Sequence, residues 1–187
     1  MLSDRRVVRV VHPEGGHVFE DLAPRLWDVT GDGAPEVVVV ETDPRRGAQL
    51  AVYGLTGDGF AKIAATPHIG QPNRWLAPVV AADLDGDGRI EVAYVDRPHL
   101  AKALRIWRYV DGRLVEVARA EGLTNHRIGE AVIHGGLRRC GEVPELITAN
   151  ADWSRVMASR FTGTRIEIRD IGPLSNPRDI ADALACR

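Results

Sequence analysis

The chain has no apolar run long enough to cross a membrane. Apolar runs such as Val37–Val40 and Ala77–Ala82 are short, whereas a spanning helix needs about 18 apolar residues in succession. The net charge is only -2, so no excess of one sign attracts the chain to nucleic acid or to anionic lipid. Met1–Arg6 includes no apolar stretch of signal-peptide length, which, taken literally, predicts a cytoplasmic protein. These absences argue against membrane insertion and against nucleic acid as a partner.

Cysteine and catalytic motifs are equally sparse. Cys140 and Cys186 are the only cysteines, too few for a disulfide framework and too far apart in the sequence for a typical zinc site. A single bridge between them requires an oxidising compartment, and we favour two unpaired thiols. Ser154 has no Gly-x-Ser-x-Gly context, and the chain has neither a phosphate-binding loop nor a dinucleotide fingerprint. Nothing in these motifs therefore points to an enzyme.

What the sequence does contain is an internal repeat of about 55 residues. Residues 22–40 and 76–95 both run from Leu-Ala-Pro through an acidic, glycine-rich stretch into a row of apolar residues. A third and weaker copy starts near Ile128, and its Glu145 follows Glu91 at nearly the same interval. A period of this size is typical of folds in which each repeat is one supersecondary unit.

Each unit also predicts a β-hairpin in its second half. The hairpin of the second unit is the clearest, because Asp111-Gly112 separates two stretches of strand-forming residues and favours a type I′ turn. The strands that follow the acidic stretches are almost continuously apolar, which indicates burial on both faces of a sheet. The predicted hairpin strands are Gln49–Leu55 with Phe60–Ala65, Leu104–Val110 with Arg113–Ala118, and Val156–Phe161 with Thr164–Arg169.

Four strands per unit at this period predict an all-β protein made of β-propeller-type blades. A β-sandwich is the rival fold, but it does not require a repeated spacing. About three blades and one N-terminal strand are present, so we expect an incomplete ring, because propellers close with roughly four to eight blades. The chain is then a single partial propeller, residues 1–187, with a remnant of a preceding blade at 1–19, blades at 20–70, 71–126 and 127–173, and a C-terminal tail at 174–187.

An open arc of blades has two unpartnered ends. We expect the outer sheet faces of the first and third blades to be exposed and apolar, so the chain should self-associate through them. Arg5–Val11 is expected to be a stray outer strand that pairs near Ile171, and Ile180–Leu184 to form a single helical turn. The incomplete ring also suggests a fragment, or a product of a late start codon.

The acidic stretches predict cation sites. Four carboxylates within one short loop repel one another unless a cation lies between them. Carboxylate and carbonyl oxygens joined by tight glycine turns suit Ca²⁺, which accepts six to eight oxygen ligands. The first loop has one carboxylate fewer than the second and is expected to bind more weakly. The predicted ligands are Asp83, Asp85, Asp87, the Arg89 carbonyl and Glu91 in the second loop, and Asp28, Thr30, Asp32, the Ala34 carbonyl and Glu36 in the first.

Two other interpretations compete with calcium binding. An EF-hand needs a glutamate at loop position 12 and flanking helices, and these loops have Tyr94 and Val39 there, between predicted strands. A polar Asp-Gly turn without a metal ion remains open, more so for residues 28–36 than for residues 83–91. The third copy, from His134 to Glu145, has no run of acidic residues, and we expect it to bind no metal.

The units resemble FG-GAP/VCBS repeats, which form the blades of the integrin alpha-subunit head and of many bacterial surface and secreted proteins. The matching stretches are Leu22-Ala-Pro with Asp28-Val-Thr-Gly-Asp-Gly-x-x-Glu36, and Leu76-Ala-Pro with Asp83-Leu-Asp-Gly-Asp-Gly-x-x-Glu91. Leu-Ala-Pro stands where the family has Gly-Ala-Pro. The resemblance covers residues 20–173. It implies calcium at the turn between the first two strands of a blade, and a binding or structural module in a periplasmic or extracellular full-length protein.

A propeller places the acidic loops on one face and the connections between blades on the other. The second face is rich in aromatic and amide side chains, which suit a sugar or a peptide. We favour the simpler interpretation, in which Trp75 and Trp153 pack between blades and the other side chains are solvated surface. The ligand-binding candidates are Arg74, Trp75, Asn125, His126, Arg127, Asp152 and Trp153, with His12, His17, His68, Asn73, Arg97 and His99 expected on the same face.

Three functions remain open. We favour a calcium-binding, non-catalytic module for ligand binding or adhesion, with an unidentified protein or glycan as its partner. The second is a hydrolase or lyase that acts on carbohydrate and uses the propeller as a scaffold, in which His126 and Asp152 could form an acid–base pair only if the fold joins them. The third is a purely structural module.

Overall fold

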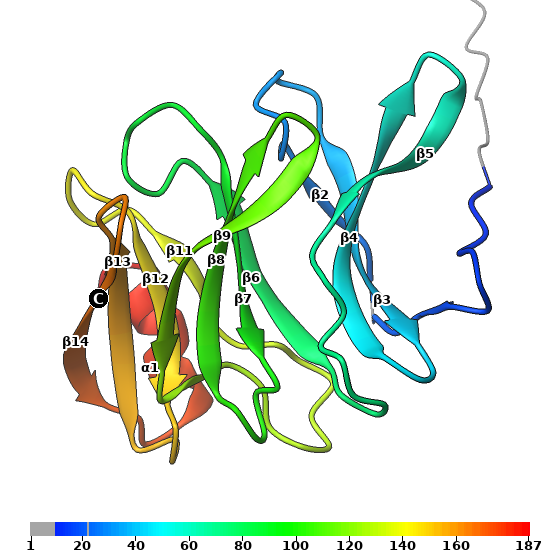
Figure 1. Cartoon of the computed structure of the whole chain (residues 1–187). Coiled ribbons are helices and arrows are strands. Elements are labelled where there is room, and N and C mark those ends of the chain that lie inside the picture. The colour runs from blue at the N-terminus through cyan, green and yellow to red at the C-terminus, as the bar shows by residue number, and fades with distance from the viewer. Residues whose placement is uncertain (1–9, 22) are drawn as a thin grey trace, which may run out of the picture.

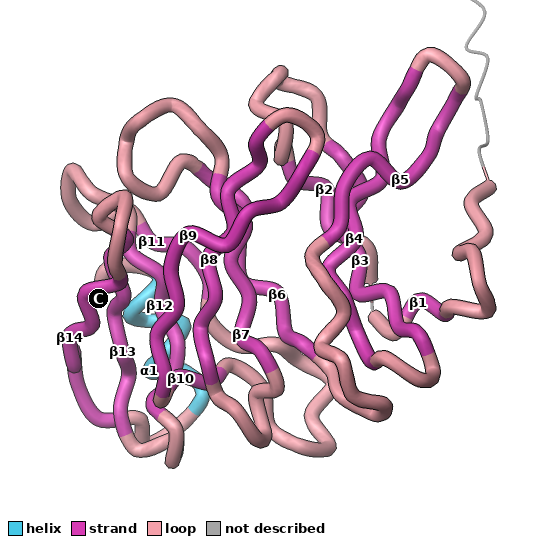
Figure 2. Tube along the Cα trace, in the orientation of Figure 1, coloured by secondary structure: helices cyan, strands magenta, loops and turns pink. Residues whose placement is uncertain are grey.

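The structure, a computed structural model, describes residues 10–21 and 23–187. Three antiparallel sheets stand side by side, and the two ends of the described chain lie at opposite ends of this row (Figure 1). Strands dominate these described residues, which also form one short helix beside the third sheet (Figure 2). This arrangement confirms the predicted all-β fold of propeller-like blades in an incomplete ring. No helix in the described residues has the length and apolarity that a membrane span requires.

The first sheet contains β1 (Val18–Phe19), β2 (Arg25–Trp27), β3 (Glu36–Asp43), β4 (Gly47–Thr56) and β5 (Gly59–Ala65). Both β1 and β2 pair antiparallel with β3, so the inner strand of this blade is split into two short pieces. Pro24, which has no N–H to donate to a strand ladder, directly precedes β2. Because β1 pairs with β3, Val18–Phe19 belongs to the first blade and not to the remnant of a preceding one.

The second sheet is the most regular. It contains β6 (Leu76–Ala82), β7 (Glu91–Asp96), β8 (Ala103–Val110) and β9 (Arg113–Glu121), each paired with the next. Asp111 and Gly112 join β8 to β9 with φ angles of 47° and 76°, as the predicted type I′ turn requires. The other two predicted hairpins, β4–β5 and the one in the third sheet, are also present.

The third sheet contains β10 (Leu123–Thr124), β11 (Gly136–Arg138), β12 (Glu145–Asn150), β13 (Arg155–Phe161) and β14 (Ile166–Pro173). Its inner strand is again split, because both β10 and β11 pair with β12. This blade starts at Leu123, earlier than the predicted boundary at residue 127.

The sheets are buried on both faces, as their continuous apolar strands predict. On β7, Val92 and Tyr94 pack in the core shared with the first sheet, whereas Ala93 and Val95 pack in the core shared with the third sheet. Adjacent residues of a strand point to opposite faces, so one strand supplies two cores. The blades are therefore held together by apolar layers between them.

A helix, α1 (Pro177–Leu184), replaces the single turn predicted at Ile180–Leu184. It is longer because its N-terminus is capped: the Asn176 side chain accepts a hydrogen bond from Arg178 N, and the Asp179 side chain accepts one from Asn176 N. Pro177 at the first helical position has the φ angle that a helix start needs.

Helix α1 covers the outer face of the third sheet. Ile180 and Ala183 are buried in one cluster with Ile147, Ala149 and Ala158, on the face that points away from the second sheet. The sequence-based expectation of an exposed apolar face on the third blade is therefore wrong, because residues 174–187 are not a free tail and bury that face.

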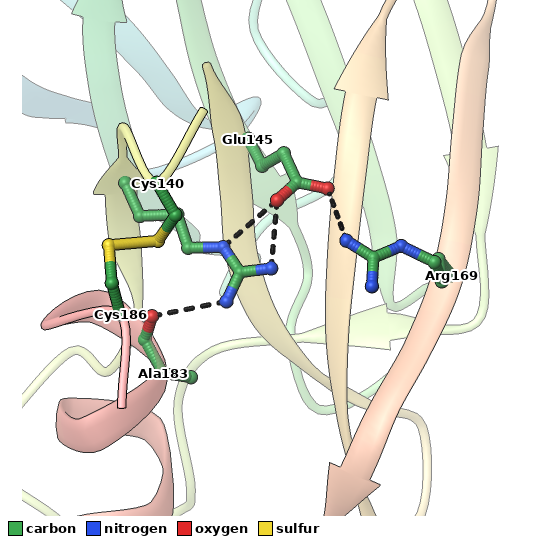
Figure 3. Close-up of a disulfide and its surroundings, with 6 residues drawn as sticks. Cys140, Glu145, Arg169, Ala183 and Cys186 are labelled. Atoms are coloured by element: carbon green, nitrogen blue, oxygen red, sulfur yellow. Dashed lines mark hydrogen bonds and ion pairs between the residues drawn. A yellow bond between two sulfur atoms is a disulfide. The ribbon is translucent and has the colours of Figure 1, made fainter. Parts of the chain in front are cut away.

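A disulfide between Cys140 and Cys186 fastens the helix (Figure 3). The favoured prediction of two unpaired thiols is wrong for a physical reason. Docking of α1 brings Cys186, just beyond the helix end, to a Cα–Cα distance of 5.6 Å from Cys140 in the loop after β11, within the range of a disulfide. The two segments are 46 residues apart in the sequence, so local patterns could not reveal their contact.

At the other end of the row, the outer face of the first sheet carries a smaller apolar cluster. Val39, Ala51 and Tyr53 are buried there, with Val11 and Phe60 packed against them. Residues 5–9 of the predicted strand Arg5–Val11 lie outside the described residues. The described part, Val10 and Val11, is not in a strand, and Val11 lies at the first sheet and not near Ile171.

Candidate functional site

The two acidic loops occupy equivalent places in their blades. One connects β2 to β3 and the other connects β6 to β7, and both lie at the upper edge of the sheets in Figure 1. The turns between β3 and β4 and between β7 and β8 lie at the opposite edge (Figure 1). The predicted separation of acidic loops and inter-blade connections onto two faces is therefore present.

In the second loop, the first carboxylate organises the turn. Asp83 accepts hydrogen bonds from Gly86 N at 2.7 Å and Gly88 N at 3.0 Å. Glu91 at the end of the loop accepts one from Leu84 N at 3.0 Å. Both glycines have positive φ angles, which is why a carboxylate can gather their N–H groups at so short a spacing.

The first loop repeats this geometry. Asp28 accepts hydrogen bonds from Gly31 N at 2.7 Å and Gly33 N at 2.9 Å, and Glu36 accepts one from Val29 N at 2.7 Å. The Thr30 hydroxyl also donates to Glu36, at 3.2 Å. The two loops are thus the same structural unit, as their sequences indicate.

The remaining predicted ligands also occupy matching positions. Asp32 accepts a hydrogen bond from Ala34 N at 2.8 Å, and Asp87 accepts one from Arg89 N at 2.9 Å. Asp87 and Arg89 are exposed at the rim of the second loop. These bonds close the last turn of each loop.

Three carboxylates of the second loop converge. One oxygen each from Asp83, Asp85 and Glu91 lies within 4.8 Å of the other two. Burial raises the pKa of Glu91, although hydrogen bonds from Leu84 N and Arg108 oppose this effect. Converging carboxylate oxygens are the donors that a hard divalent cation such as Ca²⁺ prefers, so this donor set fits calcium.

An arginine that the sequence analysis missed also enters this cluster. Arg108 on β8 places its Nε 2.5 Å from Glu91 Oε1, its Nη2 2.7 Å from Asp85 Oδ2 and its Nη1 3.1 Å from Asp87 Oδ2. Arg108 is the cross-strand partner of Glu91, so the predicted β7–β8 pairing could have pointed to it. Its guanidinium neutralises part of the negative charge of the loop, which a metal ion would otherwise have to balance.

The first blade has no arginine at the corresponding place. Gly54 on β4 lies beside Glu36, where an added Cβ would be 3.3 Å from the Glu36 Cγ atom. The loop of the first blade therefore has fewer carboxylates but no competing cation from β4, which narrows the expected difference in calcium affinity between the two loops.

In the third blade, arginines surround the equivalent glutamate. Glu145 accepts hydrogen bonds from Arg138 Nε at 3.0 Å, Arg138 Nη2 at 2.8 Å and Arg169 Nη2 at 2.8 Å (Figure 3). Burial alone would raise the pKa of Glu145, but these hydrogen bonds outweigh it and hold the pKa below its usual value. Arg138 also donates to the Ala183 carbonyl at 3.2 Å, near the end of α1.

The opposite face brings some ligand-binding candidates together. The Trp75 and His126 rings meet edge to face with centroids 5.0 Å apart. Together with Phe19 they line a hollow of about 370 Å³. His99 continues the group, with its Nε2 3.0 Å from His126 Nδ1. Trp75 Nε1 donates to the Glu20 carbonyl at 2.9 Å, which fixes the indole at this hollow.

The other candidates lie apart from this hollow. The Arg127 guanidinium stacks over Trp153 at 4.5 Å. Asn125 is fully buried, and its amide donates to the Ala77 carbonyl at 3.2 Å, so its role in the fold is structural. The Arg74 guanidinium donates to the carbonyl of its neighbour Asn73 at 3.0 Å.

The hypothetical acid–base pair of His126 and Asp152 is not formed. Asp152 accepts a hydrogen bond from the Ser154 hydroxyl at 2.6 Å, whereas His126 contacts His99 and the Glu130 carbonyl. The described residues thus give this pair no common site.

Comparison with known families supports the repeat. Residues 28–94 match a family model described as an FG-GAP-like repeat. The matched segment begins with the first residue of the first acidic loop, includes the second loop and ends within β7. No curated protein matches the chain. Residues 28–94 are therefore similar to an FG-GAP-like repeat, as their acidic loops predict.

Proposed function

We propose that this chain is a calcium-binding, propeller-type module that binds a protein or glycan ligand without catalysing a reaction. The observation that carries the proposal is the convergence of Asp83, Asp85 and Glu91 oxygens within 4.8 Å. Calcium must share these carboxylates with Arg108, or displace its guanidinium toward solvent. We therefore expect modest affinity, with dissociation constants of roughly 10⁻⁵–10⁻³ M, as for extracellular oxygen-ligand sites.

The hollow at Trp75 and His126 is the proposed ligand site. Aromatic rings with a few polar groups at a concave surface suit a sugar ring or a peptide side chain. This hollow lies among the connections between blades, away from the acidic loops. Calcium then acts by stiffening the blades and does not touch the ligand.

The disulfide supports a periplasmic or extracellular setting for the full-length protein. Disulfides persist in oxidising compartments and are rare where thiols are kept reduced. Cys140 and Cys186 are bonded and fasten α1 to the third sheet, so the fold itself gains from an oxidising environment.

Calorimetric titration with calcium tests the metal site. Asp85→Ala should weaken or abolish one site, whereas Asp58→Ala, in the exposed β4–β5 turn, should leave the isotherm unchanged. Calcium at about 100 times its dissociation constant should also stabilise the fold by about 2.7 kcal/mol. An isotherm for Asp85→Ala identical to that of the wild type would overturn the assignment.

A glycan array and a peptide array test the ligand site separately. Binding that is lost in Trp75→Ala and retained in Trp107→Phe, a substitution in the core between the first two sheets, would support the hollow. Binding that survives Trp75→Ala would place the ligand elsewhere, and no binding on either array would favour a purely structural module.

A further inference from the structure

A second group of metal-ligating side chains lies at the edge opposite the acidic loops. His17 directly precedes β1, Asp43 is the last residue of β3, and His68 lies in the connection after β5. One ligand atom from each lies within 4.8 Å of the other two. His17 Nε2 is 3.4 Å from Asp43 Oδ2, and the two imidazole rings meet edge to face at 5.1 Å. Three separate segments of the first blade therefore present two imidazoles and a carboxylate to one point.

The hydrogen bond on the far side of His17 prepares its ring for a metal ion. His17 Nδ1 lies 2.5 Å from Glu41 Oε1, so in the neutral ring Nδ1 carries the hydrogen and donates a hydrogen bond to the carboxylate. Nε2, which faces Asp43, then keeps its lone pair. A carboxylate that holds the outer nitrogen of a histidine is the usual support of a metal-bound imidazole.

Glu41 is itself held firmly in place. This fully buried carboxylate also accepts hydrogen bonds from Gln49 Nε2 at 3.1 Å, Tyr53 Oη at 2.5 Å and Lys62 Nζ at 2.7 Å. Four donors therefore fix the orientation of Glu41: His17 in the N-terminal segment, two side chains on β4 and one on β5. The ring of His17 has little freedom to turn its Nε2 away.

His68 provides a second and independent observation. Its Nε2 atom is buried and has no hydrogen-bond partner among the described residues. A buried polar atom without a partner is costly and calls for an explanation, such as an ion.

Arg46 is the competing partner at this place. Its Nε lies 2.6 Å from Asp43 Oδ2, and its Nη2 lies 3.5 Å from His17 Nε2. The Arg46 side chain is 58 % exposed, whereas those of His17 and Asp43 are 10 % and 5 % exposed. The arginine can therefore swing into solvent while the three ligands stay where they are.

We propose that His17, Asp43 and His68 bind a divalent transition-metal ion, with Zn²⁺ as the best match. Two imidazoles and one carboxylate are common zinc donors, and water completes a tetrahedral site. The ion ties the N-terminal segment, the end of β3 and the connection to the second blade together. It fastens the first blade as the Cys140–Cys186 disulfide fastens the third.

Cobalt is a suitable probe, because Co²⁺ takes zinc sites and absorbs visible light when bound to nitrogen and oxygen ligands. The wild-type chain, titrated with Co²⁺ in the presence of excess Ca²⁺, should show a saturable visible band that Zn²⁺ removes. His68→Ala should lose the band, whereas His134→Ala and Asp85→Ala, both outside the cluster, should retain it. Asp85 is a proposed calcium ligand of the second acidic loop, so a cobalt band that Asp85→Ala retains would show that the two metal sites are independent.

Two further variants separate metal binding from an effect on folding. Glu41→Gln should weaken Co²⁺ binding by about tenfold or more, as loss of a supporting carboxylate does. Arg46→Gln should bind Co²⁺ more tightly than the wild type, a gain that misfolding cannot produce. A band retained in His68→Ala, or no band in both the wild type and Arg46→Gln, would overturn the proposal.

Discussion

Arg108 Nε lies 2.5 Å from Glu91 Oε1, so an arginine of β8 lies within the carboxylate cluster of the second acidic loop. The Glu91 side chain is fully buried and that of Arg108 is 11 % exposed, which makes the pair a buried one. The carboxylates can thus be balanced by the arginine, by calcium or by both. We therefore expect the calcium affinity of this loop to depend on Arg108 as well as on the number of carboxylate ligands.

Arg108→Met should increase calcium affinity at the second loop by about tenfold, equivalent to about 1.4 kcal/mol. The reason is that calcium no longer competes with a guanidinium for Asp85 and Glu91. Without calcium the same variant should lose about 3–5 kcal/mol of unfolding free energy, because Glu91 keeps a buried charge without its partner. Calorimetric titration and chemical denaturation with and without calcium measure the two effects.

Arg105→Met is the matched control for this experiment. Arg105 lies on the same strand and pairs with Glu116 and Asp96, away from the acidic loop. It should change stability and leave calcium affinity as it is. Equal or lower calcium affinity in Arg108→Met would contradict the competition between arginine and metal.

Removal of the disulfide should loosen α1 from the third sheet. The double variant Cys140→Ser/Cys186→Ser opens a link across 46 residues, and the chain-entropy model assigns such a link about 2–4 kcal/mol of unfolding free energy. The melting temperature should fall accordingly, and a reducing agent should have the same effect on the wild type. If the reducing agent also destabilises the double variant, the effect does not arise from this bond.

Truncation of the helix contact should expose the outer face of the third blade. Ile180 is buried in the cluster beneath α1, so Ile180→Ala should cost about 2–5 kcal/mol through lost burial and a cavity. Binding of a fluorescent dye to exposed apolar surface, together with light scattering for self-association, measures the outcome. Ala181→Ser, on the exposed side of the helix, is the control. A variant as stable and as monodisperse as the wild type would show that α1 is not needed as a cover.

Stability in acid should depend on Glu145. Hydrogen bonds from Arg138 and Arg169 lower its pKa in the folded state from the ordinary value of 4.5, against the effect of burial. The unfolded chain therefore binds this proton at higher pH than the folded chain does. The stabilisation is present above about pH 4.5 and is lost as the pH falls through the folded-state pKa. Glu145→Gln should be less stable at neutral pH and should show a shallower loss between pH 5 and pH 3, as followed by denaturation at a series of pH values. An unchanged pH slope would mean that other carboxylates account for the acid sensitivity.

Local patterns were sufficient for the repeat and its hairpins. The positive φ angles of Asp111 and Gly112 follow from a requirement of the turn itself, and a neighbouring residue elsewhere in the fold has little influence on them. The acidic loops are similar for the same reason, since Asp28 and Asp83 each bind N–H groups only three and five residues away. The sequence also predicts that strand β7 is buried on both faces, because its apolar run has no polar face to expose.

The sequence by itself thus determined the blades, the turns and the shape of the acidic loops, all of which depend on residues close together in the chain. Only the tertiary structure decided what lies against them. Arg108 on β8 forms an ion pair with Asp85 of the acidic loop. Cys186 bonds to Cys140 once the helix has docked. His17, which precedes β1, contacts His68, which follows β5. Each of these contacts depends on how distant segments pack, and the free energy of that packing is shared among many weak apolar contacts that no short motif records.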